Sequence, residues 1–244
     1  MATYRLDVAY DGAGFSGYAR QDGQVTIQGE LEGALAITLG ASVVTAVAGR
    51  TDAGVHALGQ VVSFQSEDEL DVDRLWRSLN GIVGPAIAVT GVSRVEDDFD
   101  ARHSATWRRY RYLIDTRPFH DPLTRHLSWH VGRSLDLESM RSAGMAFIGE
   151  HDFSSFCRSV EGRSNRRRVT ELASEEAEGL ITIWMQANAF CHQMVRSVVG
   201  YLYDVGRGFS DGSVAAAVIE AGDRSAVATV APPHGLTLWS VGYA

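Results

Sequence analysis

The segment Gly49–Ala57, with the sequence GRTDAGVHA, is where residue types and spacing are best suited to chemistry. It places a cation, a carboxylate and an imidazole, Arg50, Asp52 and His56, within seven positions between two valine-rich segments. Its two glycines permit tight turns and a close approach of the backbone to a ligand. Taken alone, Asp52 is compatible with a nucleophile, a base, a metal ligand or an Asx turn that satisfies only its own backbone.

Arg196 is the second candidate, because it lies within an apolar segment, Phe190–Val205, that is predicted to form one long amphipathic helix. Positions 191, 194, 195, 198, 199 and 202 form the apolar stripe of this helix, and Arg196 lies one step from it. A mostly buried arginine normally has a carboxylate partner, because an unpaired buried charge is very costly. A structural salt bridge and a functional ion pair both remain open for Arg196.

Metal binding fits the sequence poorly. His126 and His130 have i,i+4 spacing, but their segment is predicted to be a strand and no third ligand is evident. His151, Asp152 and Cys157 do not form a recognisable metal-binding spacing either. We therefore expect no metal site.

The composition excludes several kinds of chemistry. All 22 cationic residues are arginine, and the chain has no lysine. This rules out the phosphate-binding P-loop, the lysine of protein kinases and lysine Schiff bases. Any anion that this protein binds through side-chain charge is held mainly by guanidinium groups, whose planar fork suits phosphates and carboxylates.

The formal charge of −8 hides an uneven distribution. Residues 102–168 carry 13 arginines and 7 acids, whereas residues 1–101 and 169–244 have balances of −9 and −5. In the basic segment, two clusters stand out, one of them interleaved with aromatic residues: Trp107, Arg108, Arg109, Tyr110, Arg111 and Tyr112, and Arg163, Arg166, Arg167 and Arg168. Alternating charge and stacking surfaces are typical of RNA-binding strands, although a solvated charged face fits either cluster taken alone.

Hydrophobic periodicity and capping residues predict the elements that position these residues. The first half is predicted to be β-α-β-β-α-β, the order of ferredoxin-like domains. Its expected strands and helices are Tyr4–Tyr10, a helix from the N-cap Thr26 to Leu39, Val43–Val47, Val61–Phe64, a helix capped by Asp71, and Ile87–Val95. Those of the second half are strands Trp107–Ile114, Leu127–Val131, Val169–Ala173, Leu180–Gln186 and Leu236–Tyr243, and helices Asp136–Ile148, Phe190–Val205 and Gly212–Glu220.

These elements predict an α+β fold with two ferredoxin-like or RRM-like domains, residues 1–102 and 103–244. We expect the domains to share a mainly antiparallel central sheet, with the active-site cleft between them. Cys157 and Cys191 lie far apart without a C-x-x-C motif, which is typical of proteins of the reducing cytoplasm. The sequence also predicts neither a membrane span nor a signal peptide, so we expect a cytoplasmic protein.

In order along the chain, these motifs resemble the tRNA pseudouridine synthase A family. The resemblance covers essentially the whole chain, through YDG at 10–12, AGRTDAGVHA at 48–57, FDAR at 99–102, HDF at 151–153, MVR at 194–196 and APPHGL at 231–236. Three positions depart from the usual pattern. The first loop has Gly-Tyr-Ala-Arg-Gln at 17–21 where the family usually has Gly-Trp-Gln-Arg-Gln, and Cys191 stands in the place of a tyrosine.

The resemblance implies a cofactor-independent isomerisation of uridine to pseudouridine at positions 38, 39 and 40 in the anticodon arm of tRNA. It also implies a homodimer, with each tRNA lying across both subunits. By family position, Asp52 is the catalytic aspartate and Arg196 its ion-pair partner. Tyr110 stacks on the target base, and Arg50 helps to hold the flipped nucleotide.

Arg108, Arg167 and Arg168 are further expected to contact the RNA backbone, which positions the substrate without reading bases. Two other classes of function remain as alternatives. The first is a non-catalytic RNA-binding module. The second is a metal-dependent phosphohydrolase that uses Asp7, Asp11 and Asp52, which the sequence disfavours because these carboxylates form no recognisable metal motif.

Overall fold

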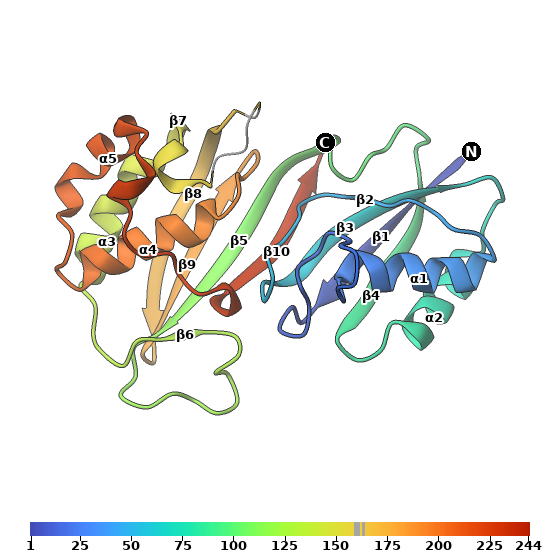
Figure 1. Cartoon of the computed structure of the whole chain (residues 1–244), viewed down its shortest axis with the longest axis horizontal. Coiled ribbons are helices and arrows are strands. Elements are labelled where there is room, and N and C mark those ends of the chain that lie inside the picture. Colours follow the sequence, from blue (N-terminus) through green and yellow to red (C-terminus); the bar gives the residue numbers. More distant parts are fainter. Residues whose placement is uncertain (159–161, 163) are drawn as a thin grey trace. The chain divides into compact units, whose positions relative to one another are not determined.

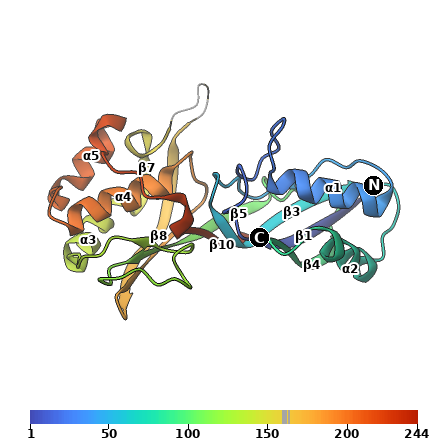
Figure 2. The same cartoon turned by 60° about the horizontal axis from the view of Figure 1, so that its bottom comes forward.

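The computed structural model of the chain describes residues 1–158, 162 and 164–244 and divides into two compact units (Figures 1 and 2). Unit 1 comprises Met1–Thr106 and Thr237–Ala244, and unit 2 comprises Trp107–Leu236. The first boundary between the units therefore lies after Thr106, four residues beyond the domain boundary predicted at residue 102. The last strand, which the prediction placed in the second domain, is grouped with unit 1.

The sheet of unit 1 has the strand order β4-β1-β3-β10, and a short strand, β2, pairs with β3. The elements are β1 (Ala2–Tyr10), α1 (Ile27–Leu39), β2 (Ala46–Val47), β3 (His56–Ser66), α2 (Val72–Ile82), β4 (Ile87–Val95) and β10 (Leu236–Tyr243). The pairing of β1 with β3 and with β4 is antiparallel, whereas β10 runs parallel to the start of β3. The helices lie side by side, with the hydroxyl oxygens of Thr38 and Ser78 2.9 Å apart.

Local sequence explains the boundaries of these elements. Alternate residues of β1 are fully or nearly fully buried, as the polar/apolar alternation predicted. Thr26 accepts a hydrogen bond from Gly29 N at 3.2 Å, and Gly40 ends α1 with φ of 70°, so both predicted caps are confirmed. The strand predicted over Val43–Val47 is shorter in the structure, because only Ala46 and Val47 pair with β3 and Val44 is exposed.

The sheet of unit 2 has the order β5-β9-β8-β7, with β6 paired to β5. Its elements are β5 (Ala105–Asp115), β6 (Trp129–His130), α3 (Leu137–Gly144), β7 (Gly149–Asp152), β8 (Arg166–Ala177), β9 (Leu180–Ala187), α4 (Met194–Gly206) and α5 (Ala215–Ala221). The pairings β5–β9, β9–β8 and β8–β7 are all antiparallel. Both units thus combine helices with a mainly antiparallel sheet, which confirms the predicted α+β class.

Several elements of unit 2 differ from the sequence prediction: β6 and α5 are shorter than predicted, and β8 is longer. The polar strand β7 was not predicted, because it has no alternating hydrophobic pattern. Helix α3 ends at Gly144 and continues as a 3₁₀ turn over Met145–Phe147. Helix α4 begins at Met194 instead of Phe190, because Gln193 has a φ of 65°, which no helical residue adopts.

Cys157 and Cys191 are bonded as a disulfide, with their Cα atoms 5.8 Å apart. The segment before β8 and the turn before α4 lie next to each other here, since Arg158 N donates to His192 O at 3.0 Å. This bond goes against the expectation that the two cysteines, far apart and without a C-x-x-C motif, are typical of a reducing compartment, because the fold brings together segments that are 34 residues apart. Among the described residues, no helix is long and apolar enough to cross a membrane.

Candidate active site

Asp52 lies in the loop between β2 and β3 of unit 1. The loop turns sharply here: Val55 N donates to Asp52 O at 3.1 Å, and Gly54 has a φ of 77°. This left-handed backbone conformation favours glycine, which explains the order Asp-Ala-Gly-Val. Asp52 is partly exposed and Arg50 is exposed. Both residues can therefore be reached by a ligand from solvent.

Thr51, the residue before Asp52, is anchored from two sides. Its carbonyl oxygen accepts the N–H of Tyr18 at 3.0 Å, and its hydroxyl lies 2.8 Å from that of Tyr10. The side chains of Thr51, Tyr10 and Tyr18 are all buried. Asp52 is therefore carried by a backbone that is fixed to the protein core one residue earlier.

Tyr18 is one of the two positions in the first loop that depart from the family pattern. Its side chain is completely buried, and its ring lies 6.3 Å from that of Tyr10. Burial raises the pKa of the Tyr18 phenol well above its usual range, so this group stays neutral. Tyr18 therefore belongs to the packing beneath the Asp52 loop.

His56 and Gly12 hold the far end of the same loop. Gly12 N donates to His56 Nδ1 at 3.1 Å, and a Cβ atom on Gly12 would collide with the carbonyl of Val55. Nδ1 also lies 3.0 Å from Asp11 Oδ1. One nitrogen cannot accept from Gly12 and donate to Asp11 at once, so which of the two contacts is a hydrogen bond depends on whether Nδ1 carries a proton. Because His56 is buried, we assign it to the support of the loop.

In unit 2, Arg196 is the third residue of α4, in its first turn rather than in the middle of a helix. Its Nε donates to Ala231 O at 2.8 Å, and its own carbonyl accepts the N–H of Ala231 at 3.0 Å. These two bonds fasten α4 to the segment that carries the APPHGL motif. Arg196 is partly exposed, so it is less buried than the sequence predicted.

The APPHGL segment also packs on β5. Tyr112 donates its hydroxyl proton to Pro232 O at 2.8 Å, and a Cβ atom on Gly235 would collide with the Tyr112 ring. Burial raises the pKa of Tyr112, while the positive charge of Arg196 acts in the opposite direction. Tyr112 and Arg196 are thus electrostatic neighbours, and the segment Ala231–Gly235 supports both.

Tyr110 lies two residues before Tyr112, on the same face of β5. It is buried, with 7% of its surface exposed, and meets the edge of Phe190 at a centroid distance of 4.9 Å. Unit 2 therefore brings Tyr110, Tyr112 and Arg196 to one region.

The three arginines expected to contact RNA have different surroundings. Arg108 is buried and donates from Nη1 to Asn188 O at 2.9 Å. Arg167 is partly exposed and donates to Ser164 O at 2.8 Å. The side chain of Arg168 is 65% exposed and lies 3.3 Å from Glu150. Exposure therefore favours a phosphate contact for Arg168 and not for Arg108, while Arg163 lies outside the described residues.

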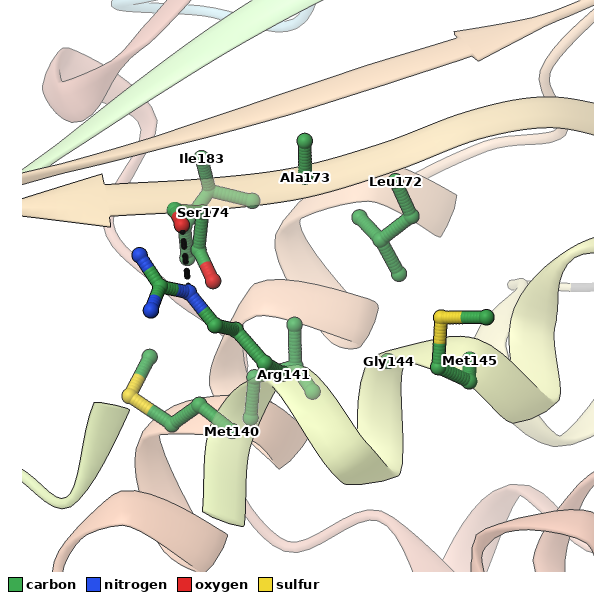
Figure 3. A pocket seen from close by; sticks show the side chains of 9 residues that line it. Met140, Arg141, Gly144, Met145, Leu172, Ala173, Ser174 and Ile183 are labelled. Atoms are coloured by element: carbon green, nitrogen blue, oxygen red, sulfur yellow. Dashed lines mark hydrogen bonds between the residues drawn. The ribbon is translucent and has the colours of Figure 1, made fainter. Parts of the chain in front are cut away.

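A pocket of about 250 Å³ lies between α3 and the strands β8 and β9 of unit 2 (Figure 3). Its lining is mostly apolar and includes Met140, Leu172 and Ile183. Arg141 lies at this pocket and donates from Nε to Ser174 O at 2.8 Å. None of the predicted site residues lines it.

Residues 143–244 match the model of a family described as tRNA pseudouridine synthase. Relatives named tRNA pseudouridine synthase A match almost the whole chain. The relative from Frankia casuarinae is 44% identical, covering all of this chain and 90% of the relative. The relative from Streptomyces griseus is 42% identical, covering 98% of this chain and 87% of the relative. The relative from Brevibacillus brevis is 37% identical, covering all of both chains.

These matches define the class of protein as a tRNA pseudouridine synthase, which is an isomerase. The relatives that match over almost the full length of the chain share one more specific name, tRNA pseudouridine synthase A. The chain belongs to the tRNA pseudouridine synthase A family, as the resemblance predicted.

Proposed function

We propose that this protein converts uridine to pseudouridine at positions 38, 39 and 40 in the anticodon arm of tRNA, with Asp52 as the catalytic residue and without a cofactor. Family membership supports the reaction and the tRNA substrate. The observation that carries the assignment of Asp52 is its loop. The residues around Asp52 are fixed to the core through Thr51, Gly12 and His56, while Asp52 itself is partly exposed.

The reaction breaks the N1–C1′ bond, rotates the uracil and joins C5 to C1′, so the product is an isomer of the substrate. The ionised carboxylate of Asp52 acts next to C1′, either by attack on this carbon or by removal of a ribose proton to give a glycal. Tyr110 stacks on the uracil and takes the proton that leaves C5. Flipping the nucleotide costs a few kcal/mol, which Arg50 and the stacking interaction offset.

We propose that Arg196 is the ion-pair partner of Asp52 in the reaction, because a guanidinium group favours the ionised carboxylate. Arg196 suits this role because its Nε and its backbone are already committed to Ala231. The side chain is therefore held in one direction before substrate binds. Pre-organised charge of this kind acts without reorganisation during the reaction.

Release of tritium from tRNA labelled at uridine C5 tests the proposed function. A synthase releases tritium with EDTA present and with no added cofactor, because C5 loses its hydrogen when it bonds to C1′. The alternative, a non-catalytic RNA-binding module, binds the same tRNA and releases none. A protein that binds tRNA with uridine at positions 38–40 but releases no tritium contradicts the synthase proposal.

We further propose that the protein acts as a homodimer in the cytoplasm, where its tRNA substrate is used. The family resemblance supports the dimer, since each tRNA would lie across both subunits. Light scattering of the free protein and of its tRNA complex measures the mass. A free protein of 26.5 kDa, together with a complex that holds one protein chain per tRNA, contradicts this part of the proposal.

The exposed arginine on β8 leads to a prediction about RNA binding. Arg168→Ala is expected to weaken binding of all tRNAs alike and to reduce the slope of log K against log [salt] by about one. The reason is that a phosphate can replace Glu150 as the partner of Arg168, and each phosphate contact releases a counterion. Binding is measured by titration between low and high salt.

Arg77→Ala is the control for this measurement, because Arg77 is exposed on α2 and lies outside the basic segment 102–168. It is expected to keep the parental slope. Equal slopes for Arg168→Ala and the parent would remove Arg168 from the RNA-binding surface.

Gly12→Ala is expected to displace the Asp52 loop and lower turnover by about 10–100-fold, with little change in tRNA affinity. The added Cβ collides with the backbone of Val55, which moves only with the turn that carries Asp52. Single-turnover tritium release and tRNA binding measure the two effects. Gly14→Ala is the matched control in the same loop, because a Cβ atom there meets nothing within 4 Å. Similar turnover in both variants would contradict the proposed coupling.

A further inference from the structure

Gln60 is a polar side chain in the core of unit 1, with none of its surface exposed. It lies on β3, and both ends of its amide are used. Oε1 accepts from Gly49 N at 3.4 Å and from Val61 N at 3.3 Å. Nε2 donates to Gly49 O at 2.7 Å and to the hydroxyl of Tyr10 at 3.1 Å. Gln60 therefore satisfies its own polar atoms and both backbone groups of Gly49.

The contact with Tyr10 extends this network to the residue before Asp52. Because the oxygen of Tyr10 accepts a hydrogen bond from Gln60, its own hydroxyl proton is available for a hydrogen bond to Thr51 Oγ1, which lies 2.8 Å away. Burial raises the pKa of Tyr10 to about 12, so the phenol keeps this proton at neutral pH. Gln60 thus binds Gly49 directly and reaches Thr51 through one hydroxyl.

We propose that Gln60 is a positioning residue for the isomerisation: its amide, together with the Tyr10 hydroxyl, holds both ends of Gly49–Thr51 and so sets the place of the Asp52 carboxylate. This inference rests on the proposed role of Asp52. A glutamine fits this position because its planar amide donates two hydrogen bonds, to Gly49 O and to the Tyr10 oxygen, and also accepts from backbone N–H groups. A hydrocarbon side chain leaves the backbone groups of Gly49 and the Tyr10 oxygen without these bonds.

Gln60→Glu tests the proposal, because glutamate has the same shape but no proton to donate when it is ionised. We expect kcat at pH 8 to fall by about 100-fold, since a small displacement of a catalytic group has an effect of this size. We expect KM for tRNA to change by less than about twofold. Because burial favours the neutral acid, which donates one proton again, the ratio of variant to parental kcat rises as the pH falls from 8 to 6.

Gln65→Glu is the matched control, because Gln65 lies on the same strand but is exposed. It is expected to keep the parental kcat at every pH. Tyr10→Phe is the second test variant: it breaks the link to Thr51 and leaves the bonds from Gln60 to Gly49. Its kcat is expected to fall by about 10-fold, with no recovery at low pH. This variant decides the question if Gln60→Glu does not fold in thermal unfolding measurements.

Parental kcat in Gln60→Glu, or a rise in KM with kcat unchanged, overturns the positioning role. A lower kcat that does not recover at low pH overturns it too, because a general loss of packing has no such pH dependence. A failure of the underlying function looks different. If Asp52 is not the catalytic residue, Asp52→Asn keeps its turnover. If Asp52→Asn is inactive and Gln60→Glu is fully active, only the role of Gln60 is overturned.

Discussion

Asp52→Asn is expected to lower the rate of pseudouridine formation by at least about 10⁴-fold, while tRNA affinity stays within about twofold. Asparagine has the size of aspartate but cannot supply a nucleophilic or basic oxygen. The turn that presents the residue is closed by backbone atoms, Val55 N and Asp52 O, so the substitution leaves this hydrogen bond in place. Binding persists because a carboxylate contributes no attraction to phosphates.

Rate and affinity are measured separately in this experiment, by single-turnover tritium release and by titration with labelled tRNA. Asp73→Asn is the matched control, because Asp73 is an exposed carboxylate on α2 of the same unit. It is expected to show parental turnover. Residual activity above about 1% of the parental rate in Asp52→Asn would contradict the assignment, and loss of tRNA binding would show that the variant is damaged more widely.

The elements that could be predicted from the sequence are those with strong local signals. Strands β4 and β10 have the predicted ends, and α1 begins and ends at the predicted caps. Segments whose structure depends on pairing with distant residues were harder to predict from the sequence. The strand β7 carries no hydrophobic alternation and exists because Gly149–Asp152 pairs with Val169–Arg166 of β8. The disulfide likewise depends on two segments that meet only in the folded chain.

The same limit applies to the candidate site. The loop around Asp52 was accessible from its residue types and spacing, and Tyr10 and Gly12 lie in a second motif, but the contacts that join the two were not accessible. Gln60 binds Tyr10, which is 50 positions away, and Gly49, which is 11 positions away. The only signal in the sequence is an amide beside the apolar residues of a strand.

Arg108 illustrates how strand geometry changes the interpretation of a motif. Alternation of arginine and aromatic residues predicted an RNA-binding strand. In β5, however, residues two apart share a face, so Arg108 lies on the buried face with Tyr110 and Tyr112. The intervening Arg109 instead pairs with Glu171 at 2.7 Å. Counting arginines along the segment therefore overestimates the number that are exposed to solvent.

The prediction for Arg196 separates its charge from its hydrogen bond. Arg196→Met is expected to lower turnover by about 10²–10³-fold, the loss seen when one pre-organised stabilising group is removed from an active site. Arg196→Lys keeps the charge but has no Nε to donate to Ala231 O. If the charge of Arg196 acts on Asp52, the turnover of Arg196→Lys is expected to be at least about tenfold higher than that of Arg196→Met.

The two substitutions also distinguish a role at Asp52 from support of the APPHGL segment. Both remove the donor to Ala231 O, so both are expected to lower the unfolding temperature by similar amounts. Equal stability with unequal turnover then assigns the difference to the charge. Arg77→Met, at an exposed arginine of α2, is the control and is expected to match the parent. Equal losses of turnover in Arg196→Met and Arg196→Lys would instead make Arg196 a support of the Ala231–Gly235 backbone and leave Asp52 without its proposed partner.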